Sequence, residues 1–472
     1  MKSRQAGLTL LLRVTIVAAL VSATASLPAQ VQLHPPVRTP QGLRLEWTDP
    51  GPGSVHTVQT RDRLTGGIWL LPEAPENWPI AQTRWTDPNP SAPARFYRVL
   101  TLPAVQRGHL LNAEYRTNLT TVQIAILLAL AGVNLTPQYA VQVYKLTYET
   151  IGPWGEPTRA TAALVLPVGP GPWPLLGYQH GTILRTNDAP SAASITGELG
   201  IGVVFASQGY VTVLPDYLGL GDSPGLHPYH HARSEATAGV DALRAARAWC
   251  TQLGVALNDR LFLAGYSQGG HATMALHREI EQFHLQEFNL TASAPMAGAY
   301  DLSETTANDF LSGRPQPNPY YFAYLLAAYQ EVYRLTNSLA DLLAPPYDTL
   351  LPPLFHGHVG GGSINAVMPN NPLLILKPEI LQAFRTEPDH PLRLALRQND
   401  VHRWRPTRPM RLYHCSGDQD VVFANALAAL SHFHQQGATQ VELVEPLPGG
   451  NHATCVYPSL LQALQWFETL RR

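Results

Sequence analysis

The segment Gly265-Tyr266-Ser267-Gln268-Gly269 combines residue types and a spacing that could carry chemistry. It lies between the apolar residues 261–264, which we expect to form a buried strand, and residues 271–282, which have a helical pattern. The flanking glycines would let the chain turn sharply and lift Ser267 above the sheet. The Gln268 amide, at the start of the helix, would then face negative charge that develops on a bound substrate, as one donor of an oxyanion hole. We therefore interpret Ser267 as a nucleophile and not as an ordinary serine in a glycine-rich turn.

A serine nucleophile needs a general base, and the base needs an acid that orients it. After a strand–serine–helix turn of this kind, the acid and the histidine come from loops that follow later strands. Among the 18 histidines, His452 is the one that lies between the last predicted strand, 441–445, and the last predicted helix, 459–470. The acid would follow the predicted strand 410–414, where Asp418 and Asp420 both qualify. The sequence thus predicts a Ser-His-Asp triad with one of these two aspartates.

Such a site needs a scaffold, and the chain after residue 104 has the pattern of one. Buried-looking strands alternate with helical segments, the strands being expected at 173–179, 210–214, 261–264, 290–294, 410–414 and 441–444. This alternation predicts an α/β fold in which a mostly parallel sheet carries helices on both faces.

Residues 104–472 resemble secretory lipases and related bacterial esterases of the α/β-hydrolase superfamily. The matching motifs are Tyr178-Gln179-His180-Gly181-Thr182, the segments 216–221, 265–270 and 415–425, and His452 with Cys455. The resemblance implies ester hydrolysis and a helical cap, here expected at about residues 300–409. It also implies a second oxyanion donor after the third strand, which we assign to the Thr182 amide with Gly181 as the alternative.

The resemblance also bears on the choice of the acid. The spacing Gly-x-x-Asp, frequent in hydrolases generally, selects Asp420. The pattern Cys-Thr-x-Asp-x-x-Val-x-x-x-Asn of a group of secreted bacterial α/β-hydrolases selects Asp418 when it is aligned through Cys415, Val421 and Asn425. We expect Asp418 to be the acid and keep Asp420 as the alternative.

The chain has three cysteines, so at least one is unpaired. Cys250 ends an apparent helix at 243–249 and is expected to be a buried free thiol. Cys415 lies three residues before Asp418, and Cys455 lies three residues after His452. A hydrogen bond between acid and base could therefore bring both thiols within bridging range. We expect either a disulfide that joins the two loops or two small buried side chains.

Residues 1–25 have the pattern of a cleavable signal peptide. Lys2 and Arg4 precede an apolar run, and Ala23-Thr24-Ala25 has the small-x-small spacing of a cleavage site. The run is too short to span a bilayer, so we expect no stable membrane insertion. This pattern predicts a secreted or periplasmic protein.

Residues 31–102 have the pattern of a separate small domain. Short alternating segments, among them 43–47, 55–60, 83–86 and 95–99, are separated by turn residues, which predicts an antiparallel β-sandwich. The segment is loosely similar to the fibronectin-type-III-like modules of secreted bacterial enzymes. We expect it to act as a spacer or an accessory module.

Charge and motifs exclude several other functions. The 32 basic and 34 acidic residues nearly balance, so no broad positive field is available for nucleic acid. No dinucleotide fingerprint or P-loop is present, and we expect no cofactor. His227, His230 and His231 lack a recognised zinc spacing, so we expect substrate-side contacts or a solvated loop there and no metal site.

Together these features predict a secreted serine hydrolase that cleaves small-molecule or lipid carboxylic esters through an acyl-enzyme. Two alternatives stay open. One is a serine peptidase of the same fold, because the same triad can cleave amides. The other is a non-catalytic adhesion protein that uses both domains for binding. The sequence makes no prediction of oligomeric state.

Overall fold

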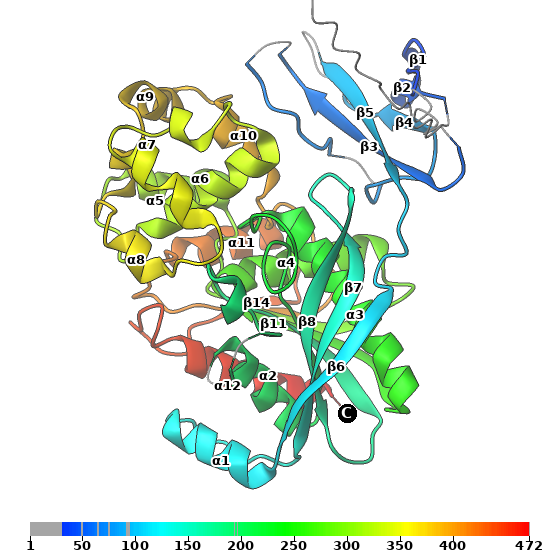
Figure 1. The fold of residues 1–472 in the computed structure, drawn as a ribbon, viewed down its shortest axis with the longest axis vertical. Coiled ribbons are helices and arrows are strands. Elements are labelled where there is room, and N and C mark those ends of the chain that lie inside the picture. Colours follow the sequence, from blue (N-terminus) through cyan, green and yellow to red (C-terminus); the bar gives the residue numbers. More distant parts are fainter. Residues whose placement is uncertain are drawn as a thin grey trace, which may run out of the picture.

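A computed structural model describes residues 31–471, apart from 49–50, 64–65, 74–75, 91–94, 193 and 196. The predicted signal peptide, residues 1–25, lies outside the described residues. Within them, one nine-stranded sheet has the order β14-β13-β12-β11-β9-β10-β8-β7-β6 (Figure 1). The first six strands of this order, from β14 to β10, are parallel to their neighbours. The pairs β10-β8, β8-β7 and β7-β6 are antiparallel. The predicted mostly parallel α/β-hydrolase sheet is therefore confirmed.

The strands of this sheet are β6 (Leu110–Leu119), β7 (Val141–Ile151), β8 (Pro157–Pro167), β9 (Trp173–Gln179), β10 (Val211–Pro215), β11 (Leu257–Tyr266), β12 (Asn289–Met296), β13 (Met410–Tyr413) and β14 (Val441–Val444). Every residue of β9 and β10 is buried, as expected for central strands that are covered on both faces. Because parallel strands end at the same edge, the loops after β9, β11, β13 and β14 meet there.

Helices cover both faces of the sheet. On one face lie α1 (Thr121–Leu130), α2 (Glu198–Ser207) and α12 (Val456–Leu470). The other face carries α3 (Ala232–Leu253), α4 (Gln268–Phe283) and α11 (Ala424–Gln435). Two apolar layers therefore hold the sheet rigidly between helices, and they fix the edge at which the loops meet.

A helical cap lies between β12 and β13, as the resemblance implied. It consists of a π-helical turn, Leu302–Thr306, and the helices α5 (Ala307–Leu311), α6 (Tyr320–Tyr333), α7 (Tyr347–Leu350), α8 (Gly361–Asn365), α9 (Pro378–Thr386) and α10 (Pro391–Gln398). Figure 1 shows these helices grouped beside the sheet. Most of the aromatic and leucine side chains of α6 form the core of the cap itself.

Two small antiparallel sheets precede the large one. The first contains β1 (Val37–Thr39), β2 (Gly42–Glu46) and β4 (Arg84–Asp87), and the second pairs β3 (Ser54–Arg61) with β5 (Phe96–Pro103). Their shared core is built from Leu45, Trp47, Val58, Trp78, Ile80 and Trp85. These sheets agree with a small all-β unit before the hydrolase. The similarity to fibronectin type III and the domain limits 31–102 and 104–472 stay predictions.

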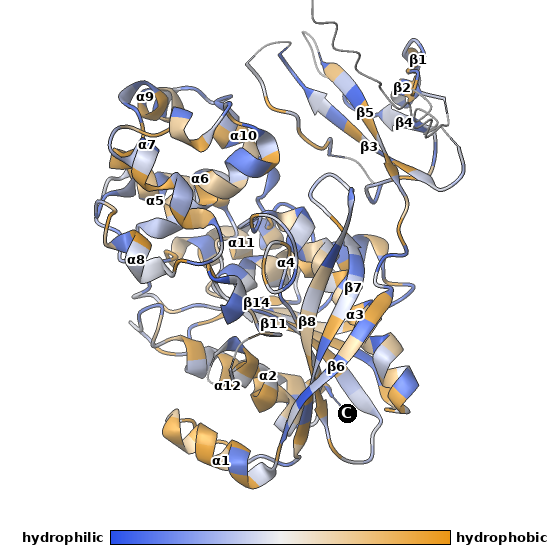
Figure 2. Ribbon diagram, viewed as in Figure 1, coloured by the Kyte–Doolittle hydropathy of each residue, from blue (hydrophilic) through white to orange (hydrophobic). Residues whose placement is uncertain are grey.

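Helix α1 is largely apolar and lies at one end of the molecule (Figure 2). Val122, Ile126 and Leu130 are exposed, whereas Ile124 and Leu128 anchor the helix to the sheet. The helix has ten residues. In the described part of the chain, no helix has both the length and the apolar character required to cross a membrane.

Candidate active site

Ser267 lies at the sharp turn between strand β11 and helix α4. Its backbone has φ 61° and ψ −120°, a left-handed conformation that is strained for a residue with a side chain. The two glycines of the motif make the turn possible. A Cβ at Gly269 would lie 1.9 Å from the Gln179 carbonyl oxygen, and one at Gly265 would lie 2.4 Å from the Gly269 carbonyl oxygen. The motif is therefore a steric requirement of the turn that carries Ser267.

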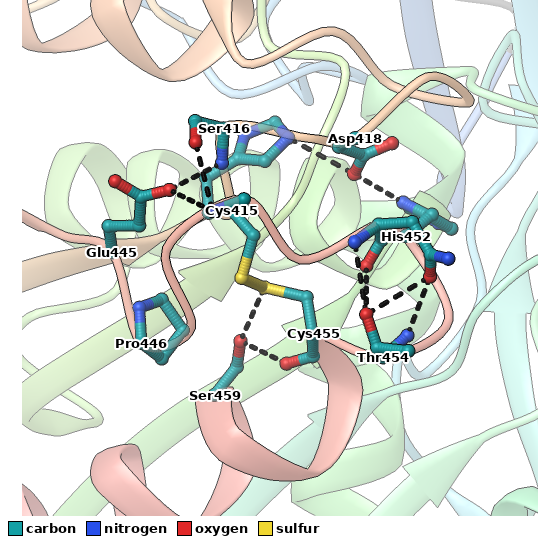
Figure 3. Close-up of a disulfide and its surroundings, with 12 residues drawn as sticks. Cys415, Ser416, Asp418, Glu445, Pro446, His452, Thr454, Cys455 and Ser459 are labelled. Atoms are coloured by element: carbon teal, nitrogen blue, oxygen red, sulfur yellow. Dashed lines mark hydrogen bonds and ion pairs between the residues drawn. A yellow bond between two sulfur atoms is a disulfide. The ribbon is translucent and has the colours of Figure 1, made fainter.

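His452 connects Ser267 to Asp418. Its Nε2 lies 2.9 Å from Ser267 Oγ. Its Nδ1 lies 2.6 Å from Asp418 Oδ2 (Figure 3). The Tyr266 hydroxyl donates a hydrogen bond of 2.6 Å to the His452 carbonyl oxygen and so fixes the loop. The three residues that the sequence proposed as nucleophile, base and acid thus form one hydrogen-bonded series.

Asp420, the alternative acid, has a different partner. Its Oδ1 accepts a hydrogen bond of 2.7 Å from the Asn318 side chain in the cap. Asp418, in contrast, has a fully buried side chain, and its Oδ1 accepts from the amides of Asp420 and Val421. Burial alone would raise the pKa of Asp418, but hydrogen bonds from His414 and His452 outweigh this effect and hold the pKa well below its usual range. Asp418 is therefore ionised at neutral pH.

A disulfide joins Cys415 to Cys455 and thereby ties the loop of Asp418 to the loop of His452 (Figure 3). Both cysteines are fully buried. The first of the two expectations for these cysteines is confirmed. Cys250 is a buried free thiol, also as predicted, and burial raises its pKa to about 12.

Three backbone amides belong to the motifs at Ser267, and they differ in whether they already have an acceptor. The Gln268 amide is the first of helix α4, so it has no acceptor within the helix. Gly181 lies against Ser267, because a Cβ at Gly181 would be 3.9 Å from Ser267 Cβ, but its amide donates to Glu198 Oε1 at 3.3 Å. No hydrogen-bond acceptor within the described residues occupies the Thr182 amide. Within the described residues, the Gln268 and Thr182 amides thus have no hydrogen-bond acceptor, whereas the Gly181 amide has one.

A pocket opens at Ser267. Its apolar wall includes Tyr229, Ala299, Leu302, Phe310, Tyr321, Leu325, Val421 and Val422. Of the aromatic residues of α6, Tyr321 lines this pocket, whereas Phe322, Tyr324 and Tyr329 are buried in the cap core. Asp309 and Asp420 add acidic groups to the lining. The cavity can take a substrate that is largely apolar and has a few polar atoms.

The sequence reasoning did not identify a buried ion pair below Ser267. Glu235 on α3 accepts hydrogen bonds from the Gln268 side chain at 2.9 Å and from His271 at 2.7 Å. The second ring nitrogen of His271 lies 2.9 Å from the Asn399 carbonyl oxygen, so both ring nitrogens face oxygen atoms. Burial raises the pKa of Glu235, but His271 outweighs it and lowers the pKa to about 2. No short motif links these residues, so only the fold could reveal them.

The histidines of the loop before α3 are buried, so the expectation of a solvated loop was wrong for them. Burial lowers the pKa of His227 to about 4 and that of His230 and His231 to about 3. These side chains are therefore neutral at pH 7. His230 lines the cavity at Ser267, in agreement with the alternative expectation of substrate-side contacts.

Two groups of buried side chains bring possible metal ligands within 4.8 Å of one another: His230, Glu235 and His271, and Asp301, Asp400 and His402. In the first group the Glu235 carboxylate already pairs with His271 at 2.7 Å. In the second, Asp301 accepts from Thr305, and Asp400 accepts from Ser303. In both clusters the carboxylates therefore already have hydrogen-bond partners, and we assign no metal to either cluster.

Comparisons with known proteins place these features in a family. The family model of secretory lipases matches residues 191–283. The rice cell wall degrading esterase LipA from Xanthomonas oryzae is 33% identical, with a TM-score of 0.69 over 78% of this chain and 100% of that chain. A putative hydrolase from Legionella pneumophila is 29% identical, with a TM-score of 0.72 over 77% of this chain and 98% of that one. No match is found among curated proteins.

Candida antarctica lipase A shares the fold, with a TM-score of 0.60 and 17% identity over 78% of this chain and 84% of that chain. The sheet, the cap and these likenesses define an α/β-hydrolase. Within that class, the chain belongs to the lipase and esterase family, whose reaction is the hydrolysis of esters.

Proposed function

We propose that this protein is a secreted or periplasmic serine hydrolase that cleaves carboxylic esters through an acyl-enzyme. In this proposal Ser267 is the nucleophile, His452 the general base and Asp418 the acid. The observation that carries it is the unbroken series of hydrogen bonds from Ser267 Oγ through His452 to Asp418. Each contact has the length that proton transfer and ring orientation require.

The reaction follows from these contacts. His452 Nε2 takes the proton of Ser267 as Oγ attacks the ester carbonyl carbon, and it then passes that proton to the departing alcohol. Water enters, and His452 takes its proton as the water oxygen attacks the acyl carbonyl carbon. The bond to Ser267 Oγ then breaks, His452 returns the proton to Oγ, and the free acid leaves. Asp418 stays ionised throughout, and it holds the ring of His452 and stabilises the imidazolium form.

The tetrahedral intermediate carries its negative charge on the former carbonyl oxygen. The free amides of Gln268 and Thr182 are proposed to receive it, and the positive end of helix α4 adds to the stabilisation. Gly181 is the weaker candidate, because its amide already donates to Glu198.

We propose small-molecule or lipid esters as substrates, and no cofactor, nucleic acid or inserted membrane segment takes part. The apolar cavity at Ser267 supports an acyl or alcohol group of low polarity. Export is supported by the similarity to secretory lipases and by the disulfide, which is typical of oxidising compartments.

The experiment that tests this function compares p-nitrophenyl esters of increasing acyl length with peptide amides. We expect turnover of esters, a loss of that turnover in Ser267→Ala, and no turnover of amides. Faster cleavage of peptide amides would instead support the peptidase alternative. Folded protein that cleaves neither substrate would support the adhesion alternative.

A further inference from the structure

His414 lies directly after strand β13, one residue before the disulfide, and its side chain is fully buried. Its Nε2 is 3.2 Å from Asp418 Oδ2 and 2.9 Å from the Val421 carbonyl oxygen. In the proposed reaction the same oxygen, Oδ2, also accepts a hydrogen bond from His452 Nδ1. A second histidine therefore touches the proposed acid without touching the nucleophile.

The contacts of His414 determine which ring nitrogen carries a proton. Both neighbours of Nε2 are oxygen acceptors, so Nε2 is protonated and donates to them. Nδ1 is buried and has no hydrogen-bond partner within the described residues. Of the two ring nitrogens, Nε2 is therefore the one through which His414 donates a hydrogen bond.

Four donors surround the Asp418 carboxylate. Oδ1 accepts from the amides of Asp420 and Val421, at 3.0 and 2.9 Å. Oδ2 accepts from His452 Nδ1 and from His414 Nε2. His452 must change its charge during the reaction, so His414 is the donor to Oδ2 that stays constant. Hydrogen bonds to the ionised form also keep Asp418 charged in its buried site.

We propose that His414 is a positioning residue for the proposed triad, which holds Asp418 Oδ2 in place for His452 through its Nε2–H. The inference rests on the serine-hydrolase function proposed above. Without this donor, the carboxylate can tilt about its side-chain bond, and the ring of His452 then points less accurately at Ser267. The loss would fall on the chemical step and not on substrate binding, because His414 does not line the cavity.

The same arrangement has a consequence for pH dependence. The titratable groups near this site include Asp418, His452 and Tyr266, whose ring contacts that of His452. Glu445 is also near His414. Hydrogen bonds from Ser416, one of them from its amide, lower the pKa of Glu445, and His414 adds a smaller electrostatic contribution in the same direction. A carboxylate that loses one donor accepts more strongly from those that remain and favours the imidazolium form of His452. The acid limb of the kcat/KM profile should therefore move to higher pH, by about half a unit, when the donor is removed.

The test compares three substitutions in the full-length protein. A glutamine amide reaches about as far as imidazole Nε2, whereas an asparagine amide reaches only as far as Nδ1. We expect His414→Gln to keep kcat within about threefold, and His414→Asn and His414→Leu to lose about 10- to 100-fold, as for a hydrogen bond to a charged group. KM should change by less than about twofold in all three. Only the Asn and Leu variants should shift the acid limb.

Equal kcat values for wild type, Asn and Leu variants would overturn the inference, and so would a Gln variant as impaired as Asn. Two-bond proton–nitrogen spectra of the wild-type histidine rings provide a test that needs no variant. They should show His414 protonated on Nε2 at pH 7, and a proton on Nδ1 alone would also overturn it. If Ser267→Ala and Asp418→Asn keep full activity, the proposed function fails. If both lose activity while the His414 variants do not, only this inference fails.

Discussion

Asp418 and His452 are joined by a hydrogen bond of 2.6 Å between Oδ2 and Nδ1, although 34 residues separate them in sequence. Asp420, only two residues from Asp418, instead accepts a hydrogen bond from Asn318 in the cap. The two candidate acids thus point to different parts of the molecule, and their substitutions should have different effects.

We predict that Asp418→Asn lowers kcat by about 1,000- to 10,000-fold, because an amide neither stabilises the imidazolium nor enforces the correct tautomer. Asp420→Asn should lower kcat by less than about tenfold, since an amide oxygen at this position can still accept from Asn318 and no contact to His452 is lost. Steady-state kinetics with one p-nitrophenyl ester measure both. A larger loss in Asp420→Asn would assign the acid to that residue.

The disulfide gives a prediction for stability and for activity. Removal of both thiols by Cys415→Ala and Cys455→Ala should lower the free energy of unfolding by about 2–5 kcal/mol, because the bridge closes a loop of about 40 residues. The loops of acid and base would also move independently, so kcat should fall. Denaturant unfolding and ester kinetics test the two effects. Cys250→Ala is the matched control for the loss of a buried sulfur without loss of a bridge.

The turn at Ser267 leaves no room for a side chain at Gly269. Gly269→Ala would place its Cβ 1.9 Å from the Gln179 carbonyl oxygen, so we expect a loss of at least about 3 kcal/mol in stability and no measurable activity. Gly362→Ala is a matched control, because no atom lies within 4 Å of a Cβ there. The control should unfold at the wild-type denaturant concentration or slightly above it. A stable, active Gly269→Ala protein would contradict the steric account.

Buried neutral histidines make stability depend on pH. The folded protein holds the pKa of His231 at about 3, and the ordinary value is 6.5. Between about pH 6.5 and pH 3, His231 is therefore protonated in the unfolded chain but not in the folded protein. The free energy of unfolding falls as the pH drops through this range. His227 and His230 act in the same direction.

His231→Asn isolates one of these effects. His231 accepts the Ser234 amide at the start of α3, and asparagine can do the same without titrating. The loss of stability between pH 7 and pH 5 should be smaller by about 2 kcal/mol in this variant than in the wild type. Denaturant unfolding at both pH values measures the difference. An unchanged pH dependence would show that His231 is not held neutral.

Helices and strands with a clear apolar pattern could be predicted from the sequence. Strand β9 occupies the predicted residues 173–179, because all of its side chains are buried. Helix α3 was recognised only at residues 243–249, although it spans Ala232–Leu253. Its first half buries Glu235 and Asp241 among small residues, which hides the apolar face. Strand β6 was missed because its side chains are mostly exposed and polar.

Some residues of the candidate site could be predicted from the sequence, and others could not. Ser267 and His452 were accessible to sequence reasoning, because each lies in a motif with a defined place in the fold. The structure distinguishes Asp418 from Asp420 by their hydrogen-bond partners, because Asp418 contacts His452 and Asp420 contacts Asn318. Glu235 could not be found in advance, because its role depends on contacts between helices that are distant in sequence.

The most direct test of the central claim is covalent labelling with a fluorophosphonate, followed by peptide mapping. The account predicts a single modified residue, Ser267, and no labelling of folded Ser267→Ala. Labelling should also be slow in His452→Ala, because the serine would lack its base. A wild-type protein that stays unlabelled, or that is labelled at another residue, would contradict the assignment of Ser267 as the nucleophile.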